Sequence, residues 1–328
     1  MDKKDWLLIK SLFNSLSLSE IARRTGIPKS TISRRLQNLL TQKIKVKYVV
    51  SKKALGLTPL LLITENKVSD LPSYTISCRK GITSGNVLYV ISAYVPTTHI
   101  SSYLSLLSQD PLFIFECDDI LIWNPILSEK YGVVDLNKNE IHINFKRLSK
   151  VENEIIEFRR INPDIYDLLI ITYKENNPFL SLSKISKKGY KDYIFVKRQT
   201  LSYHFRKHVI PIWLGNSIRI YRPLSEYPVR LFIFEACDVE NLAFKLSLIP
   251  RIFTIYYSRD VIIFSAQLNS LEVFKLYKNI LVHHKARPLV CELYLEPSFV
   301  KFVIMYHYLW SNGWIKPKVA YKVRMWRD

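Results

Sequence analysis

The chain repeats part of its own sequence at half its length. Residues 16–24 read LSLSEIARR and residues 180–188 read LSLSKISKK, an offset of 164 in a chain of 328 residues. Further along, residues 30–36 align with residues 199–205 once about five extra residues between 189 and 195 are allowed for. Self-similarity of this kind indicates that one structural plan is built twice. The fold must therefore accommodate two copies of the same arrangement.

The first copy has the pattern of a winged helix-turn-helix. Apolar residues recur at helical spacing over residues 5–16, and a second helix is predicted from Ser19 to a C-cap at Gly26. Pro28 suits the first turn of a third helix. Residues 44–49 then alternate apolar with basic side chains, which predicts a small hairpin, or wing. Helix, helix, turn, polar-faced helix and wing together are typical of a DNA-binding module.

The third helix and the wing supply the predicted DNA contacts of this copy. Arg34 has the geometry for a bidentate contact to guanine and Gln37 for one to adenine, whereas the wing lysines suit phosphates. Short hydroxyl side chains near the start of the helix suit phosphates or base edges. The predicted contacts are Lys29, Ser30, Thr31, Ser33, Arg34, Arg35, Gln37, Lys45 and Lys47.

The second copy follows the same plan with a less regular sequence. Helices are predicted over residues 163–176 and 182–188, and a third helix precedes a wing over residues 210–222 that turns at 214–216. Its outward side chains are again polar or basic. The predicted contacts are Arg198, Gln199, Thr200, Ser202, Tyr203, Arg206, Lys207, Arg219 and Arg222.

Each copy is followed by strand and helix patterns in the order βαββαβ. After the first copy, strands are predicted at 59–65, 74–79, 87–95 and 112–117, with helices at 68–71 and 99–107. After the second, strands are predicted at 229–235, 252–257, 261–266 and 289–295, with helices at 239–248 and 270–281.

The predicted fold class is α+β, with two winged helix-turn-helix domains alternating with two ferredoxin-like βαββαβ domains. The two sheets are expected to pack on each other. An aromatic and basic tail that includes Trp326 is expected to lie over the second sheet, with clamping of nucleic acid as the alternative. The predicted divisions are 1–53, 54–130, a linker at 131–160, 161–223, 224–298 and the tail at 299–328.

Charge is concentrated in the two repeated segments. Residues 1–53 carry 13 Lys and Arg against 3 Asp and Glu, and residues 182–222 carry 10 against 1. The whole chain has a formal net charge of +20, so these segments hold nearly all of the excess. Two concentrated patches suit two contacts with a polyanion, although two solvated faces would give the same count.

The order of these elements resembles the Lrp/AsnC family of prokaryotic regulators. The stretch LSLSEIARRTGIPKSTISRRLQNL is similar to the family's second and recognition helices, and VVSKKALGL at 49–57 resembles its linker into the first sheet strand. The resemblance covers about the first 120 residues well. It implies a sequence-specific transcription regulator that binds double-stranded DNA, as a covalent pseudo-dimer on an asymmetric bipartite site. Half-sites are expected about 10 bp apart, or a multiple of that.

The family also implies a small-molecule effector and self-association through the ferredoxin-like sheets. No effector-contact motif can be carried over, and the glycine usual in one sheet turn is absent at residues 258–260. An effector therefore stays a possible partner.

Two other classes remain open. One is a nucleoid or replication-origin DNA-binding protein, because winged helices serve those roles too. The other is an enzyme, since siroheme decarboxylases share this plan and residues 249–264 resemble their central strands. There the side chains expected to face a tetrapyrrole are Arg251, Tyr256, Tyr257 and Arg259.

No catalytic residue, metal ligand or cofactor is predicted. His204 and His208 are four residues apart but lack the glutamate of a zincin and have cationic neighbours. The four cysteines form no CxxC pair, no glycine-rich phosphate loop is present, and no apolar run is long enough for a membrane span. These features predict a cytoplasmic, nucleoid-associated protein that is not an enzyme.

Overall fold

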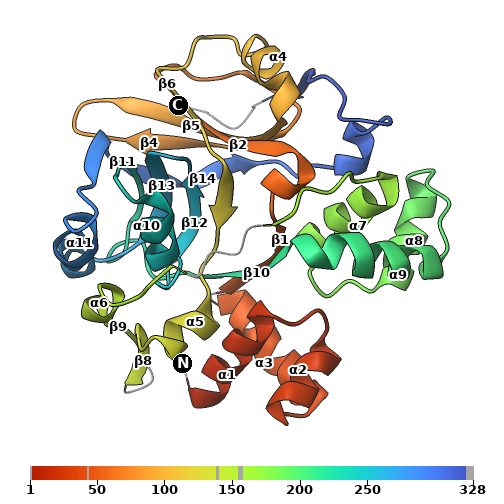
Figure 1. Ribbon diagram of the computed structural model, residues 1–328, viewed down its shortest axis with the longest axis horizontal. Coiled ribbons are helices and arrows are strands. Elements are labelled where there is room, and N and C mark those ends of the chain that lie inside the picture. Colours follow the sequence, from red (N-terminus) through yellow and green to blue (C-terminus); the bar gives the residue numbers. More distant parts are fainter. Residues whose placement is uncertain (1, 43, 138–139, 154–157, 323–328) are drawn as a thin grey trace.

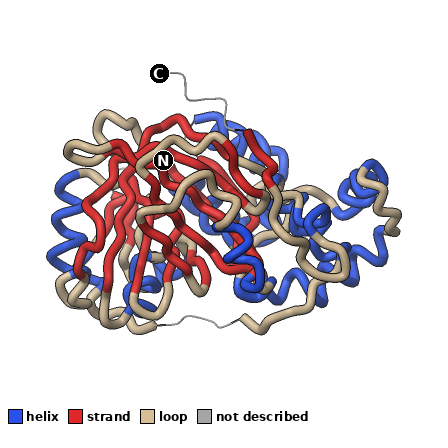
Figure 2. The backbone as a smooth tube through the Cα atoms, turned by 90° about the horizontal axis from the view of Figure 1, so that it is seen from above, coloured by secondary structure: helices blue, strands red, loops and turns tan. Residues whose placement is uncertain are grey.

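The computed structural model describes residues 2–42, 44–137, 140–153 and 158–322. Two helical modules flank a two-stranded ribbon, and a nine-stranded sheet with its own helices forms the rest of the molecule. Figure 1 shows the first module at the bottom and the second at the right. Figure 2 shows the strands gathered together and a group of helices projecting to one side. The predicted α+β class is confirmed.

The first module contains the three predicted helices. They are α1 (Lys3–Phe13), α2 (Leu18–Thr25) and α3 (Lys29–Gln42). The side chain of Ser17 accepts a hydrogen bond from a free amide at the start of α2. Gly26 ends α2 in the left-handed region, at φ 68°, which confirms its predicted C-cap role.

The second module has the same helix order but a different third helix. Its helices are α7 (Ile165–Asn176), α8 (Leu182–Lys191) and α9 (Arg198–His204). A π-helical turn at Phe205–Val209 and a 3₁₀ turn at Ile210–Ile212 follow α9 directly. The third helix therefore changes its winding before the chain enters a strand.

Residues at aligned positions of the two modules have the same structural roles. Ser17 caps α2 and Ser181 caps α8, each by accepting from the amide three residues on. Ile21 and Ile185 are both fully buried beneath these helices. The repeated LSLS sequence is thus a helix start, with a capping serine and a buried isoleucine four residues later.

The predicted wings are not hairpins. β1 (Ile44–Val50) and β10 (Trp213–Ile220) pair with each other, antiparallel, in a separate two-stranded ribbon. The turn predicted at residues 214–216 lies inside β10 instead, where Gly215 has φ 120°. Each module is followed by only one strand, and the hydrogen bonds that a hairpin would have made are made between β1 and β10.

The first half of the large sheet has four strands, and a helix lies between the third and the fourth of them along the chain. Its spatial order is β6-β2-β5-β4, which is the fourth, first, third and second strand along the chain. The elements are β2 (Leu57–Thr64), β4 (Thr75–Ile82), β5 (Val87–Pro96), α4 (Ile100–Leu104) and β6 (Phe113–Glu116). The helix predicted at 68–71 is wrong, because that segment leads into a short strand, β3 (Asp70–Pro72).

The second half repeats this spatial order as β14-β11-β13-β12. Its helices precede the second and fourth strands, as the sequence predicts. The elements are β11 (Val229–Glu235), α10 (Val239–Leu246), β12 (Ile252–Tyr257), β13 (Val261–Gln267), α11 (Ser270–Leu276) and β14 (Arg287–Lys301).

The two halves form one sheet, which goes beyond the predicted packing of two separate sheets. β4 pairs with β14, and β7 (Asp119–Leu121) pairs with β12. Because β7 follows β6 almost directly, one short segment of chain joins the two ends of the sheet. Leu61 of the first half and Ile233 of the second lie in the same apolar cluster, so the inner faces also pack on each other.

The segment predicted as a linker is folded. It contains β8 (Val134–Asn137), β9 (Glu140–Ile143) and the short helix α6 (Phe145–Leu148), and α5 (Pro125–Lys130) precedes it. Phe145 belongs to the apolar cluster of the second half of the sheet. The segment therefore takes part in the core rather than merely connecting domains.

The described part of the tail after β14 lies against α7 and β3, not over the second half of the sheet. A 3₁₀ turn at Tyr306–Leu309 packs on α7, and β15 (Val319–Lys322) pairs with β3. The indole of Trp314 donates to the carbonyl of Leu55 at 3.0 Å. Trp326 lies outside the described residues. None of the described helices combines the length and hydropathy that crossing a membrane requires.

Candidate nucleic-acid interface and the adjoining cavity

The outer face of α3 carries the first set of predicted contacts. Arg34 is exposed and has no ion pair within the described part of the chain, whereas Ile32 on the opposite face is fully buried. A helix with this division presents its donors to solvent while its apolar stripe holds it in place. Exposed on this face are Lys29, Ser30, Arg34 and Gln37, and half-buried are Thr31 and Ser33.

Arg35 does not belong to this outward set. Its guanidinium contacts Oδ2 of Asp2 at 2.9 Å and Oδ1 of Asp5 at 2.7 Å. Asp2 and Asp5 also form the capping box at the start of α1. Arg35 therefore fastens α3 to the first turn of α1, and its guanidinium is directed to these carboxylates and not to the outer face of α3.

The second module presents a similar surface with different side chains. Tyr203, which aligns with Arg34, is exposed, and the neighbouring Leu201 is fully buried. Exposed here are Arg198, Gln199, Tyr203, Arg206 and Lys207, and half-buried are Thr200 and Ser202.

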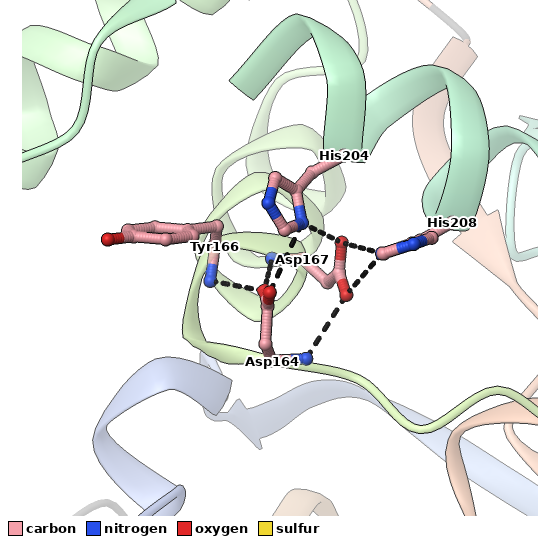
Figure 3. A network of polar contacts seen from close by, with 5 residues as sticks. All are labelled: Asp164, Tyr166, Asp167, His204 and His208. Atoms are coloured by element: carbon pink, nitrogen blue, oxygen red, sulfur yellow. Dashed lines mark hydrogen bonds and ion pairs between the residues drawn. The ribbon is translucent and has the colours of Figure 1, made fainter. Parts of the chain in front are cut away.

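Two histidines of the second module converge on a buried carboxylate (Figure 3). Nδ1 of His204 and Nδ1 of His208 each lie 3.1 Å from Oδ1 of Asp167, which is fully buried on α7. His204 also lies 3.2 Å from Oδ2 of Asp164. Asp164 and Asp167 form the capping box of α7, as Asp2 and Asp5 do for α1.

This cluster has the donor set of a possible metal site. One ligand atom from each of Asp167, His204 and His208 lies within 4.8 Å of the other two. Two imidazoles and a carboxylate suit zinc or a similar divalent ion. The same contacts satisfy the buried carboxylate without a metal, because an imidazole Nδ1–H can donate to it. The sequence pointed only to the two histidines and not to Asp167.

The basic side chains of the ribbon lie beside a cavity. Lys45 pairs across the ribbon with Arg219, and Lys47 pairs with Ser217. Lys47 and Arg219 are half-buried and line a cavity beside the ribbon, with Lys45 at an exposed position of the same wall. Lys45, Lys47 and Arg219 therefore share the face of the ribbon that lines the cavity, and their phosphate contacts stay a prediction.

Arg222, the remaining predicted wing contact, follows β10 and is half-buried. Its backbone amide donates to Oε1 of Gln267 at 3.1 Å, and its guanidinium lies 5.8 Å from the ring centre of Tyr227. These contacts hold it against the second half of the sheet.

The cavity has a volume of about 400 Å³ and lies between the ribbon, the sheet, α7 and the start of the tail. Five tyrosines and four lysines line it together with Arg219. Among the described residues, Glu175 of α7 is the only acidic side chain in its wall. Its Oε1 lies 2.5 Å from Nζ of Lys52. Sequence patterns did not single out Glu175, Lys52 or Lys301, because they come from three distant segments.

Lys47 is the most perturbed cation of the cavity. Burial, together with the facing charges of Lys301 and Arg219, lowers the pKa of Lys47 to about 7, against an opposing effect of Glu175. The cavity thus concentrates positive charge that the protein's own carboxylates do not balance.

The residues considered for a tetrapyrrole site do not come together. Tyr256 lines the cavity, but Arg251 is buried elsewhere in an ion pair with Glu272. Arg259 is exposed on the turn between β12 and β13, and Tyr257 is half-buried. Of this predicted set, only Tyr256 faces the cavity.

A scan of protein families matches residues 10–44 to the IclR helix-turn-helix domain. The match runs from α1 through α3 to the first residue of β1, and it supports the helix-turn-helix part of the Lrp/AsnC resemblance. No curated protein matches the chain.

Two solved structures are similar over most of their length. The siroheme decarboxylase NirDL is 10% identical, with a TM-score of 0.46 over 92% of this chain and 93% of the other. Its complex with an iron-uroporphyrin III analogue is 9% identical, with a TM-score of 0.48 over 93% and 95%. Likeness at this level assigns no residue and no activity.

Proposed function

We propose that the chain is a sequence-specific double-stranded DNA-binding protein that regulates transcription. The observation that carries the proposal is the helix-turn-helix segment at residues 10–44, whose third helix exposes Lys29, Arg34 and Gln37. Arg34 can read a guanine, Gln37 an adenine, and Lys29 can hold a phosphate.

We further propose that the chain is an internal duplication that acts as a pseudo-dimer. The ribbon supports this, because antiparallel pairing of β1 and β10 relates the two modules by an approximate two-fold axis. α3 enters the ribbon at Ile44 and the third helix of the second module enters at Trp213, which lie at opposite ends. The seven paired residues span about 23 Å, which separates the points at which the two third helices enter the ribbon.

The two modules carry different side chains at aligned positions, so the proposed site is bipartite and asymmetric. Arg34 of the first module corresponds to Tyr203 of the second. A palindromic site suits two identical recognition helices, whereas these two helices present different side chains to the base edges.

The test is selection of bound sequences from a random duplex library, followed by affinity measurements at two salt concentrations. A bipartite motif favoured by roughly 10³-fold or more over random DNA is the expected result. Strongly salt-dependent binding with no motif would indicate the nucleoid class instead. Absence of duplex binding at low salt would overturn the proposal and favour the enzyme alternative, in which the cavity would be assayed with a tetrapyrrole.

A further inference from the structure

We propose that the cavity beside the ribbon binds a small organic anion with at least two carboxylate or phosphate groups on a ring-containing body. The proposed site is formed by Lys47 and Arg219 of the ribbon, Lys301 of β14 and the tyrosines around them. Binding itself does not depend on the proposed function, whereas an effect of the anion on DNA binding does.

The charge balance of the cavity is the first argument. Lys52 is neutralised by Glu175, whose other carboxylate oxygen lies 3.4 Å from the hydroxyl of Tyr306. Lys47 and Arg219 are diagonal neighbours across the ribbon and repel each other, while Glu175, already paired with Lys52, is the only acidic side chain of the wall among the described residues. Unpaired cations that are partly removed from water are costly, and an anion placed between them would lower that cost.

An unpartnered polar atom is the second argument. Nε of Arg219 has no hydrogen-bond partner among the described residues. Buried polar groups are nearly always hydrogen-bonded, so this atom in the cavity wall indicates a missing acceptor. Nη2 of Arg219 donates to Oγ1 of Thr254 at 2.9 Å. The Nε–H of the same guanidinium is therefore left to donate to a bound acceptor.

The size and lining of the cavity define the rest of the ligand. About 400 Å³ lies within the range of about 300–1,000 Å³ of pockets that hold small organic molecules. The rings of Tyr94, Tyr221, Tyr256 and Phe299 contribute apolar surface to the wall. A ring-containing body suits these walls, while inorganic phosphate alone would leave most of them uncovered.

The cavity is also connected to the proposed DNA-reading helix. Leu40, near the end of α3, is 46% exposed and lines the cavity, and β1 begins four residues later. Occupation of the cavity would therefore change the packing of the end of α3 and the charge repulsion across the ribbon. The anion would then bind one arrangement of the two modules more tightly than another, and an effector acts through such a difference in affinity.

The experiment is isothermal titration of the full chain with three probes: benzene-1,2,4-tricarboxylate, adenosine 5′-diphosphate and inorganic phosphate. We expect at least one ring-containing probe to bind at least tenfold more tightly than inorganic phosphate. The K47M and R219M variants are each expected to lose at least tenfold of that affinity. K53M is the matched control, because Lys53 is exposed outside the cavity, and it should bind as the unaltered protein does.

Thermal unfolding of each variant separates loss of the site from loss of the fold. Removing a cation from a like-charged cluster should leave the ligand-free K47M protein at least as stable as the unaltered protein. Equal affinity in K47M, R219M and the unaltered protein would overturn the proposal, as would binding of none of the probes.

DNA binding is measured separately with the selected duplex. A probe that binds and changes DNA affinity supports both proposals, whereas a probe that binds a protein with no DNA affinity supports the cavity alone. DNA binding with no bound probe would reject only the cavity.

Discussion

The two helical modules use one fastening device with different residues. In the first, Arg35 of α3 contacts Asp2 and Asp5 of the capping box of α1. In the second, the aligned residue is His204, which contacts Asp164 and Asp167 of the capping box of α7. We name these two sets of contacts the arginine lock (Asp2, Asp5, Arg35) and the histidine lock (Asp164, Asp167, His204).

The difference between the locks shows which features the two modules share and which they do not. Both retain a carboxylate pair three residues apart and a basic group that ties the third helix to the first. The arginine is permanently charged and reaches both carboxylates, whereas an imidazole is shorter and is joined by a second one, from His208. His208 lies in the π-helical turn, which has no counterpart in α3. The outward residues differ while the internal fastening is retained.

The largest expected effect comes from breaking the histidine lock. D167N should lower the free energy of unfolding by about 2–3 kcal/mol, because Asp167 is fully buried and both imidazoles lose a charged acceptor. D5N is the matched variant in the arginine lock, and it should cost about 1 kcal/mol because the Asp5 side chain is 20% exposed. Urea unfolding measures both.

Zinc provides the test that would change this interpretation. If the cluster only satisfies Asp167, zinc should not alter the melting temperature. A zinc-dependent rise that is absent in H208A would instead identify Asp167, His204 and His208 as a metal site.

The second largest effect is expected in DNA binding, to which the exposed faces of the two third helices should contribute unequally. R34A is expected to weaken binding to the selected duplex by about 1–3 kcal/mol and to relax base preference at one position. Y203A, at the aligned position, should cost less than about 1 kcal/mol because it removes no bidentate contact. R259A is the control, since Arg259 is exposed on a turn of the sheet. Equal losses for R34A and Y203A on the selected duplex would contradict the proposed asymmetry.

Local sequence patterns predicted most of the elements but not their partners. Strands β11 and β12 begin and end at the predicted residues because their apolar runs are bounded by turns. The alternation along β1 also predicts a strand correctly. It does not reveal that the strand pairs with β10, 169 residues away, since a pattern of period two looks the same in a hairpin and in a ribbon.

The site residues also divide into those that a local pattern predicts and those whose surroundings depend on remote segments. Arg34 was predictable, because one helix determines which face it occupies. Lys47 was not, because its surroundings depend on Lys301 and Glu175 from remote segments. The arginine lock could have been predicted by extending the alignment of the two modules to their first helices. Asp2 and Asp5 would then have matched Asp164 and Asp167, as Arg35 matches His204.

The two strands of the ribbon also differ, since Lys47 faces Ser217 across it. In the ligand-free protein the pKa of Lys47 is about 7, below its ordinary value of 10.5. The unfolded chain therefore binds more protons between these values, and stability should rise with pH above about 7 by about 1 kcal/mol per unit. Urea unfolding of the unaltered protein and K47M between pH 7 and 9 measures this. The same slope in both would show that Lys47 is not responsible.

The smallest expected difference lies in the serines that begin the two repeated helices. Ser17 accepts from the amide of Glu20 at 3.1 Å, and Ser181 accepts from the amide of Lys184 at 3.4 Å. Glu20 also accepts from the amide of Leu16, a contact that Lys184 cannot make because its ammonium group has no acceptor. S17A should therefore cost about 1 kcal/mol and S181A about 0.5 kcal/mol of unfolding free energy. A greater loss in S181A would mean that the repeated sequence is not used in the same way at its two positions.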